Sequence, residues 1–278
     1  MISNHELTSN IKTGKRLNNR EALYLLNKFP LGGLMRLAYR TCKKKHPENT
    51  VTFVFDSNPN HTNICQTKCT FCAFWRSSKA KDAYTLSPEE LAKKVKQAEN
   101  AGATTVLFQG GHNPNGVVND WVAYLRAIRK ACPGIHIHPF SAPEIAHMAQ
   151  QEETTTRQIL QILWNEGIRT LPGGGAEILS DRVREIISAD KCTTAEWLDI
   201  MRQAHEIGFK STATMMYGHV ETDEEIIQHL ASLRDLQDQT GGFSSFIPWS
   251  FKPGNSTLGK KVRQPSHPIK YIRLLSVA

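Results

Sequence analysis

The stretch Cys65-Gln-Thr-Lys-Cys69-Thr-Phe-Cys72 places three thiols in a single loop, at spacings of four and three residues. Three cysteines this close together can converge on one metal centre. A structural zinc site takes four closed ligands, and an iron–sulfur electron carrier usually takes four cysteines. A cubane held by three cysteines leaves one iron free to bind a small molecule. The alternatives are a partial zinc site or three unrelated thiols, although zinc motifs recur in pairs and no second pair exists here.

The length and composition indicate the expected domain size, location and partners of the protein. A chain of 278 residues can form one large barrel domain, which routinely takes about 200 to 250 residues. The cysteine content and an N-terminal segment without an apolar core predict a cytoplasmic location, with Cys42, Cys132 and Cys192 as isolated thiols. No stretch approaches the roughly 20 apolar residues of a membrane span. The net charge of +8 is diffuse, so we expect neither a membrane nor a nucleic-acid partner.

The chain alternates between strand and helix patterns. Residues 1–45 are predicted to form an N-terminal helical extension, and residues 46–278 a second domain. Six strands, each followed by a helix, are predicted at 51–55, 104–109, 135–138, 168–171, 211–217 and 243–248. Such alternation indicates an α/β fold with a parallel sheet, either doubly wound or closed into a barrel. We favour the TIM-type (β/α) barrel, because polar and glycine-rich sequences follow the strands directly, where barrel enzymes place their sites.

Candidate site residues come from these strand ends. Gly110 and Gly111 follow the second strand, where glycines allow backbone groups to approach a ligand, although such a pair is also a common turn. His138 ends the third strand and either faces the barrel mouth or packs in the interior. Ser141 is explained as a helix cap if Glu144 reaches back to it in a capping box.

The fourth and fifth strands are followed by further polar groups. Three glycines, 173–175, leave room for a flat or bulky ligand, and Glu177 behind them is either a hydrogen-bond acceptor for ribose hydroxyls or a helix-entry carboxylate. His219 and Glu221 are candidates for proton transfer or substrate binding. Thr222 and Glu225 are expected to form a capping box instead.

Aromatic residues follow the sixth strand. Trp249 and Phe251 are candidates for stacking on an aromatic substrate, and Lys252 is a candidate for meeting a carboxylate. The last residues, 271–278, form an apolar helical pattern that stops without a cap. We therefore expect the sequence to lack the closing strands of the barrel.

The CxxxCxxC spacing, with the aromatic Phe71 beside the last cysteine, resembles the radical S-adenosylmethionine (radical SAM) superfamily. The resemblance implies a [4Fe-4S] cluster on Cys65, Cys69 and Cys72, whose open iron chelates the methionine part of S-adenosylmethionine. An electron from the cluster then releases a 5′-deoxyadenosyl radical, which abstracts a hydrogen from the substrate. On this resemblance, we expect the cofactor to be bound by Phe71, Gly110, Gly111, His138, Ser141 and Glu177.

A closer resemblance spans nearly the whole chain from about residue 20. Pro-Gly-Gly-Gly-Ala-Glu-Ile at 172–178 and Tyr-Gly-His-Val-Glu at 217–221 are its most specific parts. They resemble the cyclic dehypoxanthinylfutalosine synthase family of the futalosine route to menaquinone. This resemblance implies a nucleoside-like substrate that loses its ribose C4′ hydrogen and closes a spiro ring onto its benzoate ring. It places His219 or Glu221 near the substrate and implies flavodoxin or ferredoxin as electron donor.

Two other interpretations stay open. Aminofutalosine synthase and the deazaflavin (FO) synthase subunits share the cysteine loop but look less similar in the two specific segments. A non-catalytic iron–sulfur or zinc protein would use the cysteines only structurally. The family also continues past the position where this sequence stops, and His112 stands where many superfamily members have glutamate.

Overall fold

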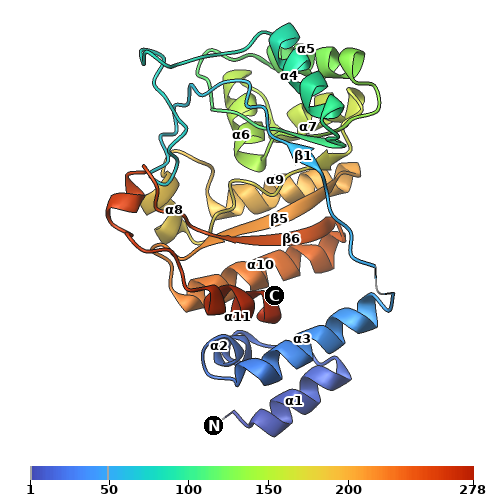
Figure 1. The fold of residues 1–278 in the computed structure, drawn as a ribbon, viewed down its shortest axis with the longest axis vertical. Coiled ribbons are helices and arrows are strands. Elements are labelled where there is room, and N and C mark those ends of the chain that lie inside the picture. Colours follow the sequence, from blue (N-terminus) through green and yellow to red (C-terminus); the bar gives the residue numbers. More distant parts are fainter. Residues whose placement is uncertain (1, 49) are drawn as a thin grey trace.

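The computed structural model describes residues 2–48 and 50–278. Three helices come first and lie together at one end of the molecule (Figure 1): α1 (Asn4–Thr13), α2 (Asn19–Asn27) and α3 (Leu31–Lys45). Asn18 caps α2 in a reciprocal pair of hydrogen bonds with Glu21. These helices share a small core of Leu7, Leu25, Phe29, Leu34 and Leu37. The helices are confirmed, and the division into two domains at residue 45 stays a prediction.

Six parallel strands follow in two sheets, ordered β1-β2-β3 and β4-β5-β6. The strands are β1 (Asp56–Ser57), β2 (Thr105–Phe108), β3 (His136–Pro139), β4 (Thr170–Leu171), β5 (Lys210–Tyr217) and β6 (Phe243–Ser250). The Thr170 side chain is within hydrogen-bond distance of two histidines of β3, so the two sheets continue as one curved layer. Within the described residues no ladder joins β6 to β1, and the layer is open between them.

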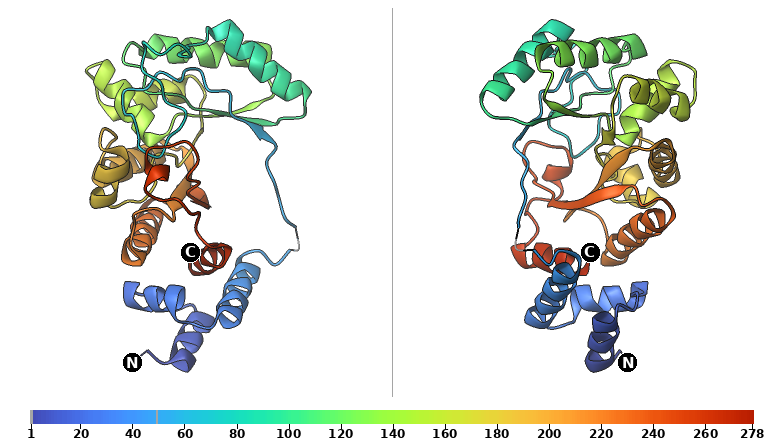
Figure 2. Two further views of the ribbon diagram at one scale, coloured as in Figure 1. Left: turned by 60° about the vertical axis from the view of Figure 1, so that its left-hand side comes forward. Right: turned by 90° about the vertical axis from the view of Figure 1, so that its right-hand side faces the viewer.

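Helices connect successive strands and wrap around the outside of the curved layer (Figure 2). Ser87 caps the first of them, with Pro88 in its first turn, as expected. Throughout residues 2–48 and 50–278, no helix is both long and apolar enough to cross a membrane. These helices are α4 (Pro88–Asn100), α5 (Val118–Ala131), α6 (Ala142–Gln151), α7 (Thr156–Asn165), α8 (Asp181–Ser188), α9 (Thr194–Ile207) and α10 (Asp223–Thr240), followed by the single turn η1 (Leu258–Lys260) and by α11 (Pro268–Val277).

Side chains alternate along each strand between the outer core and a central cavity. On β2, Val106 and Phe108 are buried in the core shared with α4 and α5, whereas Thr105 and Leu107 line the cavity. The other long strands repeat this pattern. One face of every strand thus looks into a common space, as in a barrel, whereas a doubly wound sheet carries helices on both faces. The predicted TIM-type α/β architecture with six βα units is confirmed as an open layer.

The strand predicted at residues 51–55 is wrong. Val51 and Phe53 are 90% and 88% exposed, and the ladder starts only where Asp56 pairs with Thr105. Figure 2 shows this segment as an extended connection from α3 to β1. β-Branched and aromatic residues favour a strand when a neighbouring strand and a covering layer are present. Among the described residues of this segment, only Phe55 meets a neighbouring strand, through a carbonyl that accepts from Thr104 N at 2.8 Å, and the exposed side chains of the segment have no covering layer.

Candidate active site

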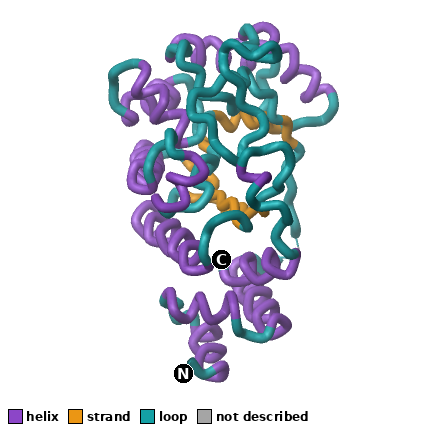
Figure 3. Tube along the Cα trace, turned by 90° about the vertical axis from the view of Figure 1, so that its left-hand side faces the viewer, coloured by secondary structure: helices purple, strands orange, loops and turns teal. Residues whose placement is uncertain are grey.

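The strand ends and the loops that follow them enclose a cavity of about 790 Å³. Figure 3 shows these loops, in teal, gathered in front of the orange strands. The cavity wall joins the cysteine loop, the glycine pair after β2 and the glycine-rich loop after β4. It contains nine of the eleven predicted site residues: Cys65, Cys69, Phe71, Cys72, Gly110, Gly111, His138, Ser141 and Glu177.

The cysteine loop is held by backbone hydrogen bonds. Cys65 N donates to Arg76 O at 3.1 Å, and Cys72 N donates to Cys69 O at 3.1 Å. Cys69 is buried, whereas Cys65 and Cys72 are partly buried, and all three are free thiols on the cavity wall. The Thr67 hydroxyl lies 3.0 Å from the Cys65 sulfur. The loop therefore presents three thiols to one space.

These thiols fit an iron–sulfur cluster better than a single metal ion. Within the described part of the chain, no three His, Cys, Asp or Glu side chains lie together in a way that could hold one ion. Cysteines that bind a cubane each take a different iron, so their sulfur atoms stay farther apart than ligands sharing one ion. Three free thiols on one wall match the cluster inferred from their spacing.

Close packing leaves no room for a side chain at Gly110 or Gly111. A Cβ on Gly110 would lie 2.2 Å from the His61 ring, and a Cβ on Gly111 would lie 2.2 Å from Ile64 O. Gly111 N donates to Thr62 O at 3.0 Å. The pair is therefore wedged against the chain that enters the cysteine loop, and it positions that loop as well as lining the cavity.

Glu144 anchors the glycine pair from the next βα unit. Its carboxylate accepts from Gly110 N at 3.1 Å and from Ser141 N and Oγ at 2.7 Å. Burial raises the pKa of Glu144, and these hydrogen bonds oppose the rise. The predicted link between Glu144 and Ser141 is confirmed. Glu144 also lines the cavity, a position that the capping prediction did not anticipate.

Lys191 is a cavity residue that sequence reasoning missed. Its ammonium lies 3.2 Å from Glu177 Oε1 and 5.3 Å from the centre of the Phe71 ring. The Lys191 and Glu177 side chains are 14% and 6% exposed. Burial opposes the charge on Lys191, but nearby Cys69 and Glu177 raise its pKa overall. A single lysine between two helices does not stand out in the sequence as a site residue. The ion pair of Lys191 with Glu177 is therefore visible only in the folded structure.

The glycine-rich loop is pressed against its neighbours. A Cβ on Gly173 would lie 2.5 Å from Thr212 O, and Gly175 adopts φ +76° with Pro143 2.2 Å from its hypothetical Cβ. Buried Arg184 donates to the carbonyls of Gly175 and Ala176, both at 2.9 Å. The glycines therefore serve close packing, and Arg184 fixes the loop from which Glu177 projects.

Polar side chains cover the inner face of the strands, where a packed barrel carries branched aliphatic ones. Burial lowers the pKa of His138 to about 4, with nearby His136 adding to the effect. The signal in the sequence is polar alternation, such as His-Ile-His, in strands expected to be buried on both faces. The polar lining includes Thr105, Gln109, His136, His138, Thr170, Thr212, Thr214, Ser244 and Ser245.

Neither His219 nor Glu221 lines the cavity, and their expected part in proton transfer or substrate binding stays a prediction. Their side chains are 0% and 1% exposed. The His219 ring donates from Nε2 to Met216 O at 3.0 Å and accepts from Val220 N at Nδ1. Glu221 accepts from Gly218 N and His219 N. Both side chains are therefore engaged in closing the turn after β5.

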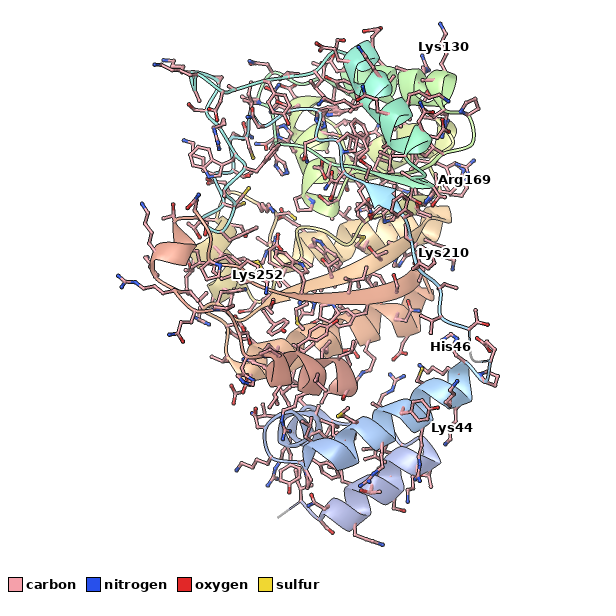
Figure 4. All side chains as sticks on the ribbon, viewed as in Figure 1. Lys44, His46, Lys130, Arg169, Lys210 and Lys252 are labelled. Atoms are coloured by element: carbon pink, nitrogen blue, oxygen red, sulfur yellow. The ribbon has the colours of Figure 1, made fainter. Side chains whose placement is uncertain are left out.

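The residues after the sixth strand divide between two environments. Trp249 lines the cavity at 40% exposure, together with Ile247. Phe251 is buried in the core beside α10, and Lys252 is exposed and lies off the cavity wall (Figure 4). The expected carboxylate contact of Lys252 is therefore not made in this cavity. Lys191 is the cation that the cavity presents instead.

Comparison with known proteins begins with the sequence model of the Radical SAM superfamily, which matches residues 59–233. The 5-amino-6-(D-ribitylamino)uracil–L-tyrosine 4-hydroxyphenyl transferase of Methanococcoides burtonii is 42% identical over 244 residues, covering 88% of this chain and 67% of its own. The aminodeoxyfutalosine synthase of Thermus thermophilus is 38% identical over 256 residues, covering 92% and 68%. The chain spans 56% to 68% of the length of these and three further transferase relatives.

A solved structure shows the same fold. The crystal structure of HydG, a maturase of the [FeFe]-hydrogenase, superposes with a TM-score of 0.74 at 19% identity, over 98% of this chain and 59% of that one. At this identity the likeness concerns the fold alone.

Proposed function

The chain belongs to the radical SAM superfamily, and from this premise we propose that it converts dehypoxanthinylfutalosine to cyclic dehypoxanthinylfutalosine in menaquinone biosynthesis. The observation that carries the proposal is the cavity itself, in which the cysteine loop and Glu177 share one wall with a polar strand face. The proposal includes a cytoplasmic location and flavodoxin or ferredoxin as electron donor.

The superfamily uses a [4Fe-4S] cluster and S-adenosylmethionine. In our proposal Cys65, Cys69 and Cys72 hold the cluster. When bound, the two groups supply a carbon radical that removes one hydrogen atom from the substrate. We assign Phe71, Gly110, Gly111, Ser141 and Glu177 to the cofactor side of the cavity, as expected from the sequence, and add Glu144 and Lys191, which line the same cavity. His138, also expected to bind the cofactor, is assigned to the substrate side instead.

The ion pair of Glu177 and Lys191 suits a zwitterionic or hydroxylated ligand. Each side chain can give up part of its interaction with the other and bind a ligand group of opposite charge or a ligand hydroxyl instead. Arg184 and Glu144 fix the two loops on which these contacts depend. A rigid wall of this kind holds the reacting groups at attack distance.

The remainder of the cavity suits the substrate. Hydroxyl groups on β5 and β6 can bind a ribose, and Ile247 and Trp249 on β6 offer an apolar surface to a benzoate ring. The ribose C4′ would lose its hydrogen and add to that ring, and the ring would then lose one proton and one electron. The loops that cover the strand ends shield the intermediate from water and other hydrogen donors on that side of the cavity.

A second candidate is aminodeoxyfutalosine synthesis. It is favoured by the 38% identity with the Thermus thermophilus enzyme over 92% of this chain. The two activities differ in substrate, so a direct assay separates them.

The test is an anaerobic assay of the cluster-reconstituted protein with reductant, S-adenosylmethionine and dehypoxanthinylfutalosine, read by mass spectrometry. We expect substrate-dependent 5′-deoxyadenosine and a product lighter by two hydrogens, and neither with Cys65→Ala. Cofactor cleavage without that product would reject the substrate. An intact cluster with no cleavage would reject the enzyme and favour a structural iron–sulfur protein.

A further inference from the structure

Three side chains form a continuous chain of hydrogen bonds across the cavity wall. The Thr170 hydroxyl lies 2.8 Å from His138 Nδ1 and 2.9 Å from His136 Nε2. His136 Nδ1 lies 3.5 Å from the Thr105 hydroxyl, at the limit of a hydrogen bond. Two histidines of β3 are thus joined through one hydroxyl of β4.

The two ends of this chain have different environments. His138 is 8% exposed and lines the cavity, and among the described residues no hydrogen bond engages its Nε2. That nitrogen is therefore available to a ligand. His136 lies farther along the same wall of the cavity and is exposed to solvent. The chain of hydrogen bonds leads from the cavity interior to water.

The hydroxyl in the middle restricts where the protons lie. Thr170 has one proton, so it donates to one histidine and accepts from the other. Burial lowers the pKa of both rings, so at neutral pH each ring keeps one N–H and one accepting nitrogen. Both rings then carry the donor and acceptor that proton passage requires.

We propose that His138, Thr170 and His136 form a proton relay that carries a proton from the substrate in the cavity to solvent. This inference rests on the proposed function, because cyclisation onto an aromatic ring releases one proton inside the cavity. A relay solves the problem of removing that proton without admitting water to the reacting carbon.

The transfer balances at each atom. The carbon–hydrogen bond of the ring breaks, and its proton forms a bond to His138 Nε2 while the Nδ1 proton of the same ring passes to Thr170. The Thr170 proton passes to His136 Nε2, and the Nδ1 proton of His136 leaves to water. The electron lost in the same step goes to a one-electron iron–sulfur acceptor. The resting state therefore has His138 protonated at Nδ1 and open at Nε2.

The central experiment is Thr170→Val, which keeps the shape of the side chain and removes the hydroxyl. We expect substrate-dependent 5′-deoxyadenosine to form at the wild-type rate, while cyclised product forms about a hundredfold more slowly, the low end of what positioned proton transfer contributes. Thr170→Ser should restore product. Thr104→Val, at an exposed position just before β2 that lies off the cavity wall, is the matched control and should stay near wild type.

Equal product rates in Thr170→Val and wild type would overturn the relay, as would equal loss of 5′-deoxyadenosine and product in a folded variant. Two measurements on the wild type need no variant. Long-range ¹H–¹⁵N spectra should show His138 protonated at Nδ1, and the Nε2 tautomer would contradict the relay. Product formation in mixtures of H₂O and D₂O should report more than one proton in flight, and the absence of a solvent isotope effect would overturn the proposal.

The assay of the wild-type protein distinguishes failure of the proposed function from failure of the relay. If the wild type makes no cyclised product from dehypoxanthinylfutalosine, the substrate assignment has failed. If the wild type makes product and Thr170→Val makes it equally fast, only the relay has failed.

Discussion

At the scale of single residues, Lys191 is a buried cation whose nearest anion is Glu177. Removing one member of a buried pair leaves an uncompensated charge. We predict that Lys191→Met lowers the free energy of unfolding of the cofactor-free protein by about 3 kcal/mol, measured by urea denaturation. Adding Glu177→Gln should restore part of the loss.

The matched control for this change is Lys130→Met. Lys130 is exposed on α5 (Figure 4), and its loss should change stability by less than about 0.5 kcal/mol. Equal stability of Lys191→Met and Lys130→Met would show that the pair with Glu177 does not stabilise the fold.

His219 should behave as a structural residue. Its two ring nitrogens are both engaged by backbone groups of its own turn. We predict that His219→Ala keeps substrate-dependent cleavage of S-adenosylmethionine while lowering the free energy of unfolding by about 1 to 2 kcal/mol, because buried backbone groups lose their partners. Cleavage at fixed protein concentration and thermal unfolding provide the two readouts. A folded His219→Ala protein that does not cleave S-adenosylmethionine would contradict this prediction and indicate that His219 takes part in the reaction.

The residue scale also shows where sequence reasoning stops. Cys65, Cys69 and Cys72 were predictable because their spacing is local. Lys191 and Thr170 acquire their contacts only when β3, β4 and the segment before α9 meet in space. The residues next to them in the sequence do not indicate these contacts.

At the scale of elements, Glu225 links α10 to α8. Its carboxylate accepts from Arg182, from Ser180 Oγ and from Thr222 N. Arg182 is the main cause that lowers the pKa of Glu225 from 4.5 to about 2. A lowered carboxyl pKa stabilises the fold above the unfolded value, and this stabilisation disappears as the pH falls through the folded value.

We therefore predict that Glu225→Gln destabilises the protein by about 1 kcal/mol at pH 7, a modest figure because Arg182 is half exposed. The difference from wild type should shrink between pH 4.5 and pH 2, the interval set by the two pKa values. Thermal unfolding across that range measures it. Glu224→Gln, next to it on the exposed face of α10, is the control, and a pH-independent difference would contradict the assignment.

Capping explains why many elements were predictable. The pairs Ser87 with Glu90 and Thr222 with Glu225 are three residues apart, so their hydrogen bonds can be anticipated from the sequence. The segment 51–55 failed for the opposite reason. Its apolar residues satisfy strand propensity, but a strand also needs a neighbour, which in this structure begins only at Asp56.

At the scale of the whole molecule, the curved layer separates two kinds of surface. Its outer face is apolar and carries the helices, and its inner face is polar and forms the cavity. The barrel-like arrangement was predictable from polar residues at the strand ends. The polar inner face leaves a signal in the sequence, the alternation of polar residues, but the same alternation occurs in strands that face solvent, so the sequence alone did not assign it.

The three N-terminal helices contact the rest of the molecule through α10, where Arg16 pairs with Asp238, and through α11. Arg273 donates to three carbonyls at the end of α2 and just beyond it, those of Leu25, Leu26 and Phe29, at 3.0 to 3.3 Å. A cation at a helix C-terminus satisfies carbonyls that lack intrahelical partners and interacts favourably with the helix dipole. Leu274, next to it, is fully buried in the core beside β5 and β6.

We predict that Arg273→Met weakens the docking of α1 to α3, since hydrogen bonds from a charged donor contribute about 1.5 to 3 kcal/mol in total. The melting temperature should fall by about 3 to 12 °C, given roughly 2 to 4 °C per kcal/mol at this chain length. Limited proteolysis should cut faster within residues 50–55, an exposed part of the connection between the helices and β1. Arg263→Met, whose side chain bonds only within its own turn, should leave both readouts unchanged. If the two variants behave alike, then apolar contacts, rather than Arg273, hold the helices in place.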